Sequence, residues 1–498
     1  MASYFEILCA AVVLFLVFYY YCVSTYDFWK KRGVSGPKPL PFFGNAKDLV
    51  FERISLAKFV QSTYETYKHL PMIGIYMCRE PLLFLNDPDL IKDVLIRDFN
   101  KFADRGLNVH ERTEPLSPNL FFLESERWRP LRKQFSPMFS SKKLKDMFPI
   151  MLRCSVHLEK YLDKLSKKVP VDIRDVAAKY TTNVIGNCAF GIDMNAMEEQ
   201  ESEFYRIAKQ FIAPSRENSL RLIVRRFSPK LYDLLGYIVP DRIFAPFFTK
   251  LVMDTIQYRK EHDFFRPDFI NTLIELRKHP EQLENIELTD TFLTAQLFIF
   301  FVAGFHTSAT TMSNALYELA LHHDLQNKLR AEITEYYDKS DGELQYETIN
   351  EMKYLDKVIK ETLRMYPAGP DIRRKATSSY TFDSMKVTIP KSMSVIIPLF
   401  AIHRDANMYP NPDQFDPERF SEEAIAARHP MSYLAFGEGP RNCIALRFGY
   451  LLTKLGLIKV LRNHKVDVCE KTMIPYEFEP KSFTLTPKGE IYLMISKI

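Results

Sequence analysis

An uncharged apolar run near the N-terminus constrains this chain more than any other feature. Ile7 to Val23 is 17 residues long, holds no Asp, Glu, Lys or Arg, and is rich in Leu, Val and Phe. A membrane-spanning helix needs about 20 apolar residues, with a range of roughly 17 to 25. The flank Ser24 to Tyr26 brings the run to that length. The run therefore predicts a membrane-spanning helix at the start of the chain.

A cleaved signal peptide is the alternative for this run. It would carry basic residues before the apolar segment and a small-residue cleavage site after it. Glu6 precedes the run instead, no Ala-x-Ala-like site follows it, and the cluster Lys30, Lys31 and Arg32 lies just beyond. The positive-inside rule then places the bulk of the chain on the cytoplasmic side. We expect residues 1–26 to form an uncleaved anchor.

The segment 27–45 is expected to be a basic, Pro- and Gly-rich hinge. Pro37, Pro39 and Pro41 remove backbone donors and fix φ, so the helix cannot continue through them. Such a segment is typical of a semi-rigid spacer. Beyond it we find no internal repeat, low-complexity tract or Gly/Ser-rich linker, and we expect residues 46–498 to form one domain.

Composition favours a mainly helical fold for this domain. Only 16 of the 498 residues are Gly, about half the usual frequency, and most segments carry helical periodicity. We expect a mainly α fold with small β-sheets (α+β). The best strand candidates are Met72–Met77, Pro81–Leu85, Met393–Pro398 and Ile491–Ile495.

Charge and cysteine usage exclude several classes of protein. The net charge of +5 is too small for a bulk nucleic-acid binder, so we expect no nucleic-acid partner. The 7 cysteines are scattered, odd in number and without a C-x-x-C pair. This argues against a disulfide framework and a zinc finger and favours a reducing compartment.

The longest predicted helix covers residues 288–321, with Thr289 as a plausible N-cap. Its first half is apolar nearly all round, which predicts burial. A second membrane span is the alternative, but Thr294, Gln296 and His306 make it costly. A second apolar stretch, Pro229–Leu251, is either ordinary core or a surface that dips into the bilayer.

The stretch from Phe436 to Ala445 carries the most informative chemistry. It reads FGEGPRNCIA and is followed by an apolar helix. Backbone N–H groups and the helix dipole stabilise a thiolate at Cys443, and the glycines allow close approach to something large and flat. Arg441 can reach an anionic group on the same object. A single thiolate in a non-polar loop suits an axial ligand to haem iron.

Two alternatives apply to this loop. One Cys near a helix start is usually a small core hydrophobe. Gly437-Glu438-Gly439 also suggests a dinucleotide loop, but the position of its third Gly is Asn442 and no strand-plus-acid context follows.

The loop resembles the haem-binding loop of the cytochrome P-450 superfamily. Further motifs follow in the family's order: Trp128–Arg132 (W-x-x-x-R), Ala303–Thr307 (A-G-x-x-T), Glu361–Arg364 (E-x-x-R) and Pro417–Phe420 (P-E-R-F). With the anchor and the hinge, the resemblance covers essentially the whole chain. The overall sequence, including the segment Phe102–Gly106, is similar to that of insect microsomal xenobiotic-metabolising members.

The resemblance implies a haem-thiolate fold and a set of cofactor-binding residues. The cofactor would be haem b (iron protoporphyrin IX), with Cys443 as the iron ligand. Arg373 and Arg374 are both near a position where many members place a further propionate-binding Arg. The resemblance implies a buried, structural Glu361–Arg364–Arg419 network that orients the cysteine loop. The other cofactor-binding residues would be Phe436 and Gly437 in the loop, and Trp128, Arg132 and Arg441 toward the propionates.

On the long helix the resemblance assigns roles to Gly304 and Thr307. Gly304 would leave room for dioxygen, and the Thr307 hydroxyl would serve proton delivery. The alternative is a helix kink and a hydroxyl bonded to the preceding turn. His306 departs from the family, which usually has Asp or Glu there; it either relays protons or faces away and packs. Ala445 is a milder departure, since Gly is commoner at that position.

The implied activity is that of a membrane-anchored monooxygenase on the cytoplasmic face of the endoplasmic reticulum. It would insert one oxygen atom of O2 into lipophilic small molecules (a xenobiotic, plant toxin, insecticide or endogenous lipid), with electrons from NADPH through NADPH-cytochrome reductase. Substrate-facing segments by resemblance are Leu107–Phe122, Phe298–Ala303, Ala368–Pro370 and Phe483–Thr484.

A basic cluster is either a solvated face or the docking site of an acidic reductase. Its members are Arg127, Arg129, Arg132, Lys133, Lys142, Lys143 and Lys145. Two other activities stay open. One is a reductase-independent peroxide isomerase or dehydratase of the same fold, which Thr307 and the basic cluster disfavour; the other is a haem carrier or sensor without turnover.

Overall fold

The structure is a computed structural model that describes most of the chain. The described residues are 4–165, 169–197, 202–212, 224, 229–237, 243–266, 268–283, 286–340, 342–482 and 484–498. Of the segments singled out above, Phe483 and residues 238–242 of the second apolar stretch lie outside them.

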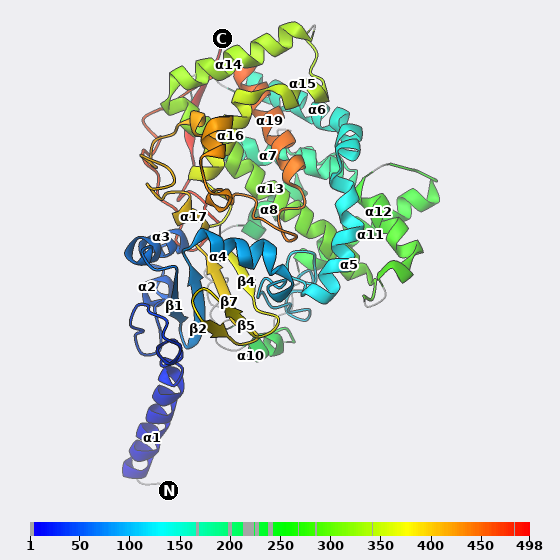
Figure 1. Cartoon of the computed structure of the whole chain (residues 1–498). Coiled ribbons are helices and arrows are strands. Elements are labelled where there is room, and N and C mark those ends of the chain that lie inside the picture. The colour runs from blue at the N-terminus through cyan, green and yellow to red at the C-terminus, as the bar shows by residue number, and fades with distance from the viewer. Residues whose placement is uncertain are drawn as a thin grey trace.

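Helices dominate the described part of the chain, as the composition predicts (Figure 1). The first half contains α1 (Tyr4–Val23), α2 (Lys47–Val50), α3 (Leu56–Tyr67), α4 (Pro88–Lys92), α5 (Ser125–Phe135), α6 (Ser141–Lys164), α7 (Ile173–Ile185), α8 (Glu203–Ile212), α10 (Pro229–Leu235) and α11 (Phe244–Glu261). The second half contains α12 (Phe269–Lys278), α13 (Asp290–Leu321), α14 (His323–Lys339), α15 (Tyr346–Glu351), α16 (Lys353–Met365), α17 (Leu399–Ile402), α18 (Glu422–Ala426) and α19 (Leu446–Asn463).

The strands form small sheets at the margin of the helical body. The largest sheet has the order β1-β2-β7-β4 and is built from β1 (Met72–Met77), β2 (Glu80–Leu85), β7 (Ser394–Ile397) and β4 (Ile372–Lys375). A second sheet joins β3 (Val171–Asp172), β9 (Tyr492–Lys497) and β8 (His464–Asp467), and β5 (Tyr380–Phe382) pairs with β6 (Val387–Ile389). All four predicted strands are present: β1 has the predicted bounds, and those of β2, β7 and β9 are shifted by one or two residues.

The long helix α13 runs through the middle of the helical body (Figure 1). Thr289 caps it as predicted, since its hydroxyl accepts the Phe292 N–H at 3.1 Å. Its side chains from Phe292 to Ala320 are mostly buried against α7, α11, α16 and α19. Although α13 is apolar enough to cross a membrane, 61% of its most apolar window is buried. Burial in the protein core therefore accounts for its composition.

Helix α1 has the opposite surroundings. It projects from the sheet end of the body (Figure 1), and only 6% of its most apolar window is buried. The residues after it pack onto β1: Trp29 is buried, and its ring nitrogen donates to the Ile75 carbonyl at 3.3 Å. The segment 27–45 is thus held against the sheet by tertiary contacts in addition to its prolines.

Candidate active site

The cysteine loop is a tight turn closed by backbone hydrogen bonds. The Cys443 N–H donates to the Phe436 carbonyl at 2.9 Å, and α19 begins three residues later, at Leu446. Gly437 and Gly439 both have positive φ (69° and 75°), a backbone region that favours Gly. A Cβ on Gly439 would lie 1.9 Å from the Leu95 carbonyl oxygen, so the loop approaches that backbone as only glycine allows.

The Cys443 side chain is exposed, although its loop leads into the largely buried helix α19. Although solvent reaches its surface, protein atoms surround the thiol on many sides, and this desolvation raises its pKa; a hydrogen bond with the Ala445 backbone and the charges of Arg105 and Arg132 act in the opposite direction. A metal ion bound to this sulfur would deprotonate it outright. Cys443 is therefore an accessible soft ligand on a rigid turn.

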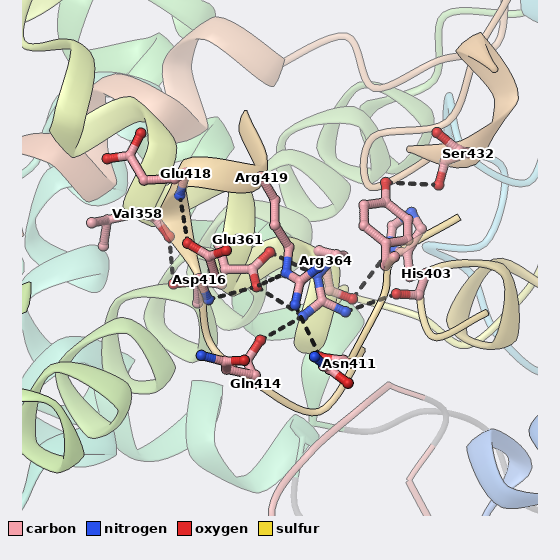
Figure 2. A network of polar contacts seen from close by, with 12 residues as sticks. Val358, Glu361, Arg364, His403, Asn411, Gln414, Asp416, Glu418, Arg419 and Ser432 are labelled. Carbon is pink, nitrogen blue, oxygen red and sulfur yellow. Dashed lines mark hydrogen bonds and ion pairs between the residues drawn. The ribbon is translucent and has the colours of Figure 1, made fainter. Parts of the chain in front are cut away.

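A buried ion-pair network joins Glu361, Arg364 and Arg419, as the resemblance implied (Figure 2). Glu361 on α16 receives two hydrogen bonds from Arg364, at 2.7 Å on Oε2 and 2.8 Å on Oε1, and Nε of Arg419 lies 3.4 Å from Oε1. The side chains of Glu361 and Arg364 are fully buried. The Asp416 N–H also donates to Glu361, at 2.9 Å. The network thus ties α16 to the segment that leads into the cysteine loop.

His403 connects this network to Leu434, two residues before the cysteine loop, through hydrogen bonds. The Arg364 guanidinium donates to the His403 carbonyl at 2.8 Å, and the His403 ring nitrogen Nδ1 lies 3.2 Å from the Arg364 carbonyl (Figure 2). The other ring nitrogen, Nε2, accepts the Leu434 N–H at 2.8 Å. Only a neutral imidazole accepts at Nε2 while it donates at Nδ1. Burial, followed by the charge of Arg364, lowers the pKa of His403 to about 3, which keeps it in that form.

Three arginines beside the loop share an unusual feature: buried guanidinium nitrogens without a hydrogen-bond partner. These are Nε of Arg105, Nε of Arg374, and Nε and Nη1 of Arg441. In the described part of the chain no carboxylate lies within 4.0 Å of any of the three guanidinium groups. Burial lowers the pKa of Arg441 to about 9 and that of Arg105 to about 10. The pKa of Arg374 falls well below its usual value through burial and the charges of Arg105 and Arg441.

Clustered, buried cations of this kind require an anionic group. The Arg105 guanidinium also donates to the Arg441 carbonyl at 3.0 Å, and Arg441 stacks on Trp128 with 4.3 Å between its central carbon and the ring centroid. A group with two carboxylates next to an accessible thiol satisfies this arrangement. Haem, with two propionates beside an iron that binds sulfur, has that chemistry, so the residues present fit it.

Arg373 and Arg374 are consecutive residues of strand β4, and the sequence alone did not decide which of them belongs to the site. Successive side chains of a strand point to opposite faces. Arg373 is partly exposed and donates to Asp371 at 2.9 Å, whereas Arg374 is buried beside Arg105 and Arg441. Of this pair, only Arg374 belongs to the buried arginine cluster. Arg132 takes another position: it donates to the Asn442 backbone carbonyl at 2.9 Å and to its side chain at 3.1 Å.

Helix α13 is a continuous α-helix through Ala303, Gly304 and Thr307. The Thr307 hydroxyl donates to the Ala303 carbonyl at 2.6 Å, which is a bond to the preceding turn. A Cβ on Gly304 would lie 2.8 Å from Cδ1 of Ile185, so the glycine lets α7 pack close to α13. The roles of Gly304 and Thr307 in oxygen chemistry stay predictions.

His306 points toward the C-terminal loop. Its Nε2 lies 3.0 Å from the Thr484 hydroxyl and 3.2 Å from the Thr486 hydroxyl. The long helix and the region of Thr484, which are far apart in the sequence, are therefore in contact in the structure.

Comparison with known proteins decides the family. The family profile for cytochrome P450 matches residues 34–494. Cytochrome P450 6a2 of Drosophila melanogaster is 38% identical over 490 residues, which cover 95% of this chain and 96% of the relative. This chain belongs to the cytochrome P450 family. Probable cytochrome P450 6a23 of the same fly is 40% identical over 95% of both chains, and cytochrome P450 6B1 of Papilio polyxenes is 37% identical over 98% of both.

Membership of the P450 family makes the protein a haem-binding oxidoreductase with the P450 fold. The predicted family, the mainly helical fold class and the haem cofactor are therefore confirmed at this level. The likeness to P450 6 proteins of insects agrees with the finer resemblance seen around Phe102–Gly106.

The sequence did not predict that Arg105 lies beside the candidate cofactor-binding residues. Arg105 belongs to the segment Phe102–Gly106, which resembles insect members of the family. The available signal was a lone arginine after an aromatic residue and an aspartate, which identifies no partner by itself. Only the fold places its guanidinium beside Arg441 and Arg374.

Proposed function

We propose that this P450 is a membrane-anchored haem-thiolate monooxygenase. It inserts one oxygen atom of O2 into lipophilic small molecules (a xenobiotic, plant toxin, insecticide or endogenous lipid). The electrons come from NADPH through NADPH-cytochrome reductase, and the enzyme works on the cytoplasmic face of the endoplasmic reticulum. The observation that carries the proposal is the cluster of buried guanidinium groups, with nitrogens left without a hydrogen-bond partner, beside the accessible thiol of Cys443.

Each part of the site has a defined task in this proposal. Cys443 binds the haem iron, and Phe436 and Gly437 hold the turn that presents its sulfur. Arg441, Arg374 and Arg105 pair with the propionates, with Trp128 packed on Arg441. Arg132 fixes the loop through Asn442. Bound haem supplies the chemistry of dioxygen activation.

Residues on α13 would serve oxygen chemistry and substrate binding in this proposal. The Thr307 hydroxyl donates to Ala303 in the structure, and a rotation about χ1 releases it for proton delivery to the reacting centre. Gly304 keeps α13 and α7 close together, which fixes the position of that helix. Phe298 and Phe301 on α13 contribute to an apolar environment suited to a lipophilic substrate.

The proposed reductase-docking surface is smaller than the basic cluster of the sequence. Arg127 is bonded to Glu124 and Glu111, Arg129 to Asn100, and Lys145 to Glu347. Arg132 is turned toward the loop. This leaves Lys133, Lys142 and Lys143 on and beside α5 and α6 to attract an acidic partner.

Two apolar surfaces support the anchoring proposal. Helix α1 is exposed along nearly its whole length. Leu234 on α10 and Tyr237 just after it are also exposed, at 55% and 64% of their surface, and α10 lies at the end of the body from which α1 projects (Figure 1). A helix in the bilayer with a second apolar contact beside it would hold the catalytic domain against the membrane.

Reconstitution tests this proposal. The full-length protein is incorporated into vesicles with NADPH-cytochrome reductase, NADPH and a panel of lipophilic compounds, and products are identified by mass spectrometry under 18O2. We expect NADPH-dependent products that carry one 18O atom. Conversion of an organic peroxide without reductase, with no 18O uptake from O2, would contradict the proposal and favour an isomerase or dehydratase.

A further inference from the structure

Three hydroxyl side chains of the C-terminal loop form a closed cluster next to α13. Ser482, Thr484 and Thr486 lie within hydrogen-bond distance of one another, with oxygen–oxygen distances of 2.9, 2.9 and 3.1 Å. We call these residues the hydroxyl cluster. His306 contacts two of its members through Nε2, Thr484 at 3.0 Å and Thr486 at 3.2 Å.

The cluster connects the interior to the outer part of the loop. Thr486 is buried, with 8% of its surface exposed, whereas Ser482 is partly exposed. At the inner end, His306 directly precedes Thr307 on α13. A continuous line of hydrogen-bonding side chains therefore leads from the outer part of the C-terminal loop to the neighbour of Thr307.

The chemistry of these groups suits the movement of protons. A hydroxyl donates one hydrogen bond and accepts others, so it can receive a proton on one side as it releases one on the other. An imidazole has the same property across its two ring nitrogens. Burial, followed by the charge of Arg174, lowers the pKa of His306 to about 4. The ring is therefore neutral near pH 7 and moves a proton only when a neighbour replaces it.

We propose that Ser482, Thr486, Thr484 and His306 form a relay that carries protons from solvent to the active site, in addition to the Thr307 hydroxyl. A hydronium ion of the solvent gives a proton to Ser482, the Ser482 proton moves to a threonine oxygen, and that threonine's proton moves to Nε2 of His306. Nδ1 of His306 then gives its own proton to a water molecule on the active-site side, which becomes the hydronium ion there. One proton is transferred in total, each O–H or N–H bond that breaks is replaced by one that forms, and no electron moves. This inference rests on the proposed monooxygenase function.

A purely structural tie between α13 and the loop is the competing interpretation. It predicts that removal of the hydroxyls loosens the loop and weakens substrate binding. The relay instead predicts a loss of proton delivery with the binding site intact. The two are separated by measurements that report on proton transfer and on binding independently.

The test uses full-length, haem-loaded protein with its reductase. The variants are Thr484→Val, Thr486→Val and their combination, which keep side-chain shape but remove hydroxyls, with the Thr→Ser replacements as rescue. His306→Gln keeps a hydrogen-bonding side chain but lacks an imidazole. Thr182→Val is the matched control, since Thr182 is buried and its hydroxyl donates only within its own helix, to the Ala178 carbonyl at 2.8 Å.

We expect product formed per NADPH to fall about tenfold in the double Val variant and in His306→Gln, with the missing electrons recovered as hydrogen peroxide. The solvent deuterium isotope effect on product formation should change in the same variants. The Ser replacements should return both values to within about twofold of the parent protein, and Thr182→Val should leave them unchanged. Substrate dissociation constants from binding spectra and the thermal unfolding midpoint should stay near those of the parent.

The relay would be overturned if product per NADPH and the isotope effect stayed unchanged in these variants. Weaker substrate binding or a lower unfolding midpoint in the same variants would then establish the structural tie. If the double variant does not load haem, the Ser482→Ala variant replaces it in the test. This variant removes only the outermost hydroxyl, and the relay predicts that it also lowers product per NADPH; an unchanged value would overturn the relay. Failure of the proposed function itself is recognised separately, since the parent protein would then form no 18O-labelled product with reductase.

Discussion

The guanidinium of Arg441 lies over the ring of Trp128, with 4.3 Å between its central carbon and the ring centroid, while two of its nitrogens have no hydrogen-bond partner. The stacking fixes the orientation of the side chain and leaves its charge without a counter-ion. A buried charge in this state is costly unless an anion completes it. We therefore propose that the arginine cluster is already arranged to form ion pairs with the haem propionates.

The two neighbouring arginines of β4 give a matched test of this contact. Arg374→Gln should accelerate haem loss about tenfold, because it removes one charge-assisted hydrogen bond to the cofactor. Arg373→Gln is the control, since Arg373 bonds Asp371 away from the cluster. Haem transfer to an excess of apomyoglobin gives the rates; equal rates in the two variants would remove Arg374 from the site.

The fully buried Glu361–Arg364 pair should be essential for the folded loop. Glu361→Gln leaves an arginine without its carboxylate, which costs about 3–5 kcal/mol, and we expect most of the protein to lose haem. Glu418→Gln removes a carboxylate that pairs with Lys328 and Lys357 at the surface, and should cost less than about 1 kcal/mol. Urea denaturation of both variants measures the difference; similar losses would show that the buried network contributes little.

His403 makes stability depend on pH in a defined direction. Its pKa is about 3 in the folded protein and 6.5 in the reference state, so between these values the unfolded chain binds a proton that the folded protein excludes. The contribution of His403 to the free energy of unfolding is thus fully present above about pH 6.5. It falls on acidification by about 1.4 kcal/mol for each pH unit. His403→Gln should have a shallower slope by that amount between pH 6 and pH 4, by urea denaturation. Parallel slopes would refute the neutral His403.

The lysines of the proposed reductase surface should act through association. Reversal of charge in the double variant Lys142→Glu/Lys143→Glu should raise the reductase concentration for half-maximal rate about tenfold at low salt, with less effect at high salt. Lys260→Glu, an exposed position in the last turn of α11, is a control on another element. Titration of reductase at two ionic strengths measures this; an unchanged titration curve would place docking elsewhere.

Much of the fold followed from the sequence because its signals are local. The Thr289 cap, the apolar length of α13 and the alternation in β1 and β2 need only neighbouring residues. The arginine cluster did not follow, because Arg105, Arg374 and Arg441 come from three segments that only the tertiary fold brings together. The surroundings of His306 were equally hidden, since its partners lie 178 and 180 residues away.

The identity of the iron ligand is the central claim, and the spectrum of the reduced protein with carbon monoxide tests it most directly. We predict the red-shifted band of a thiolate-bound haem in the parent protein and in Cys469→Ala, a control at a second, partly exposed cysteine. We predict loss of that band in Cys443→Ala. A red-shifted band that survives in Cys443→Ala would contradict the account.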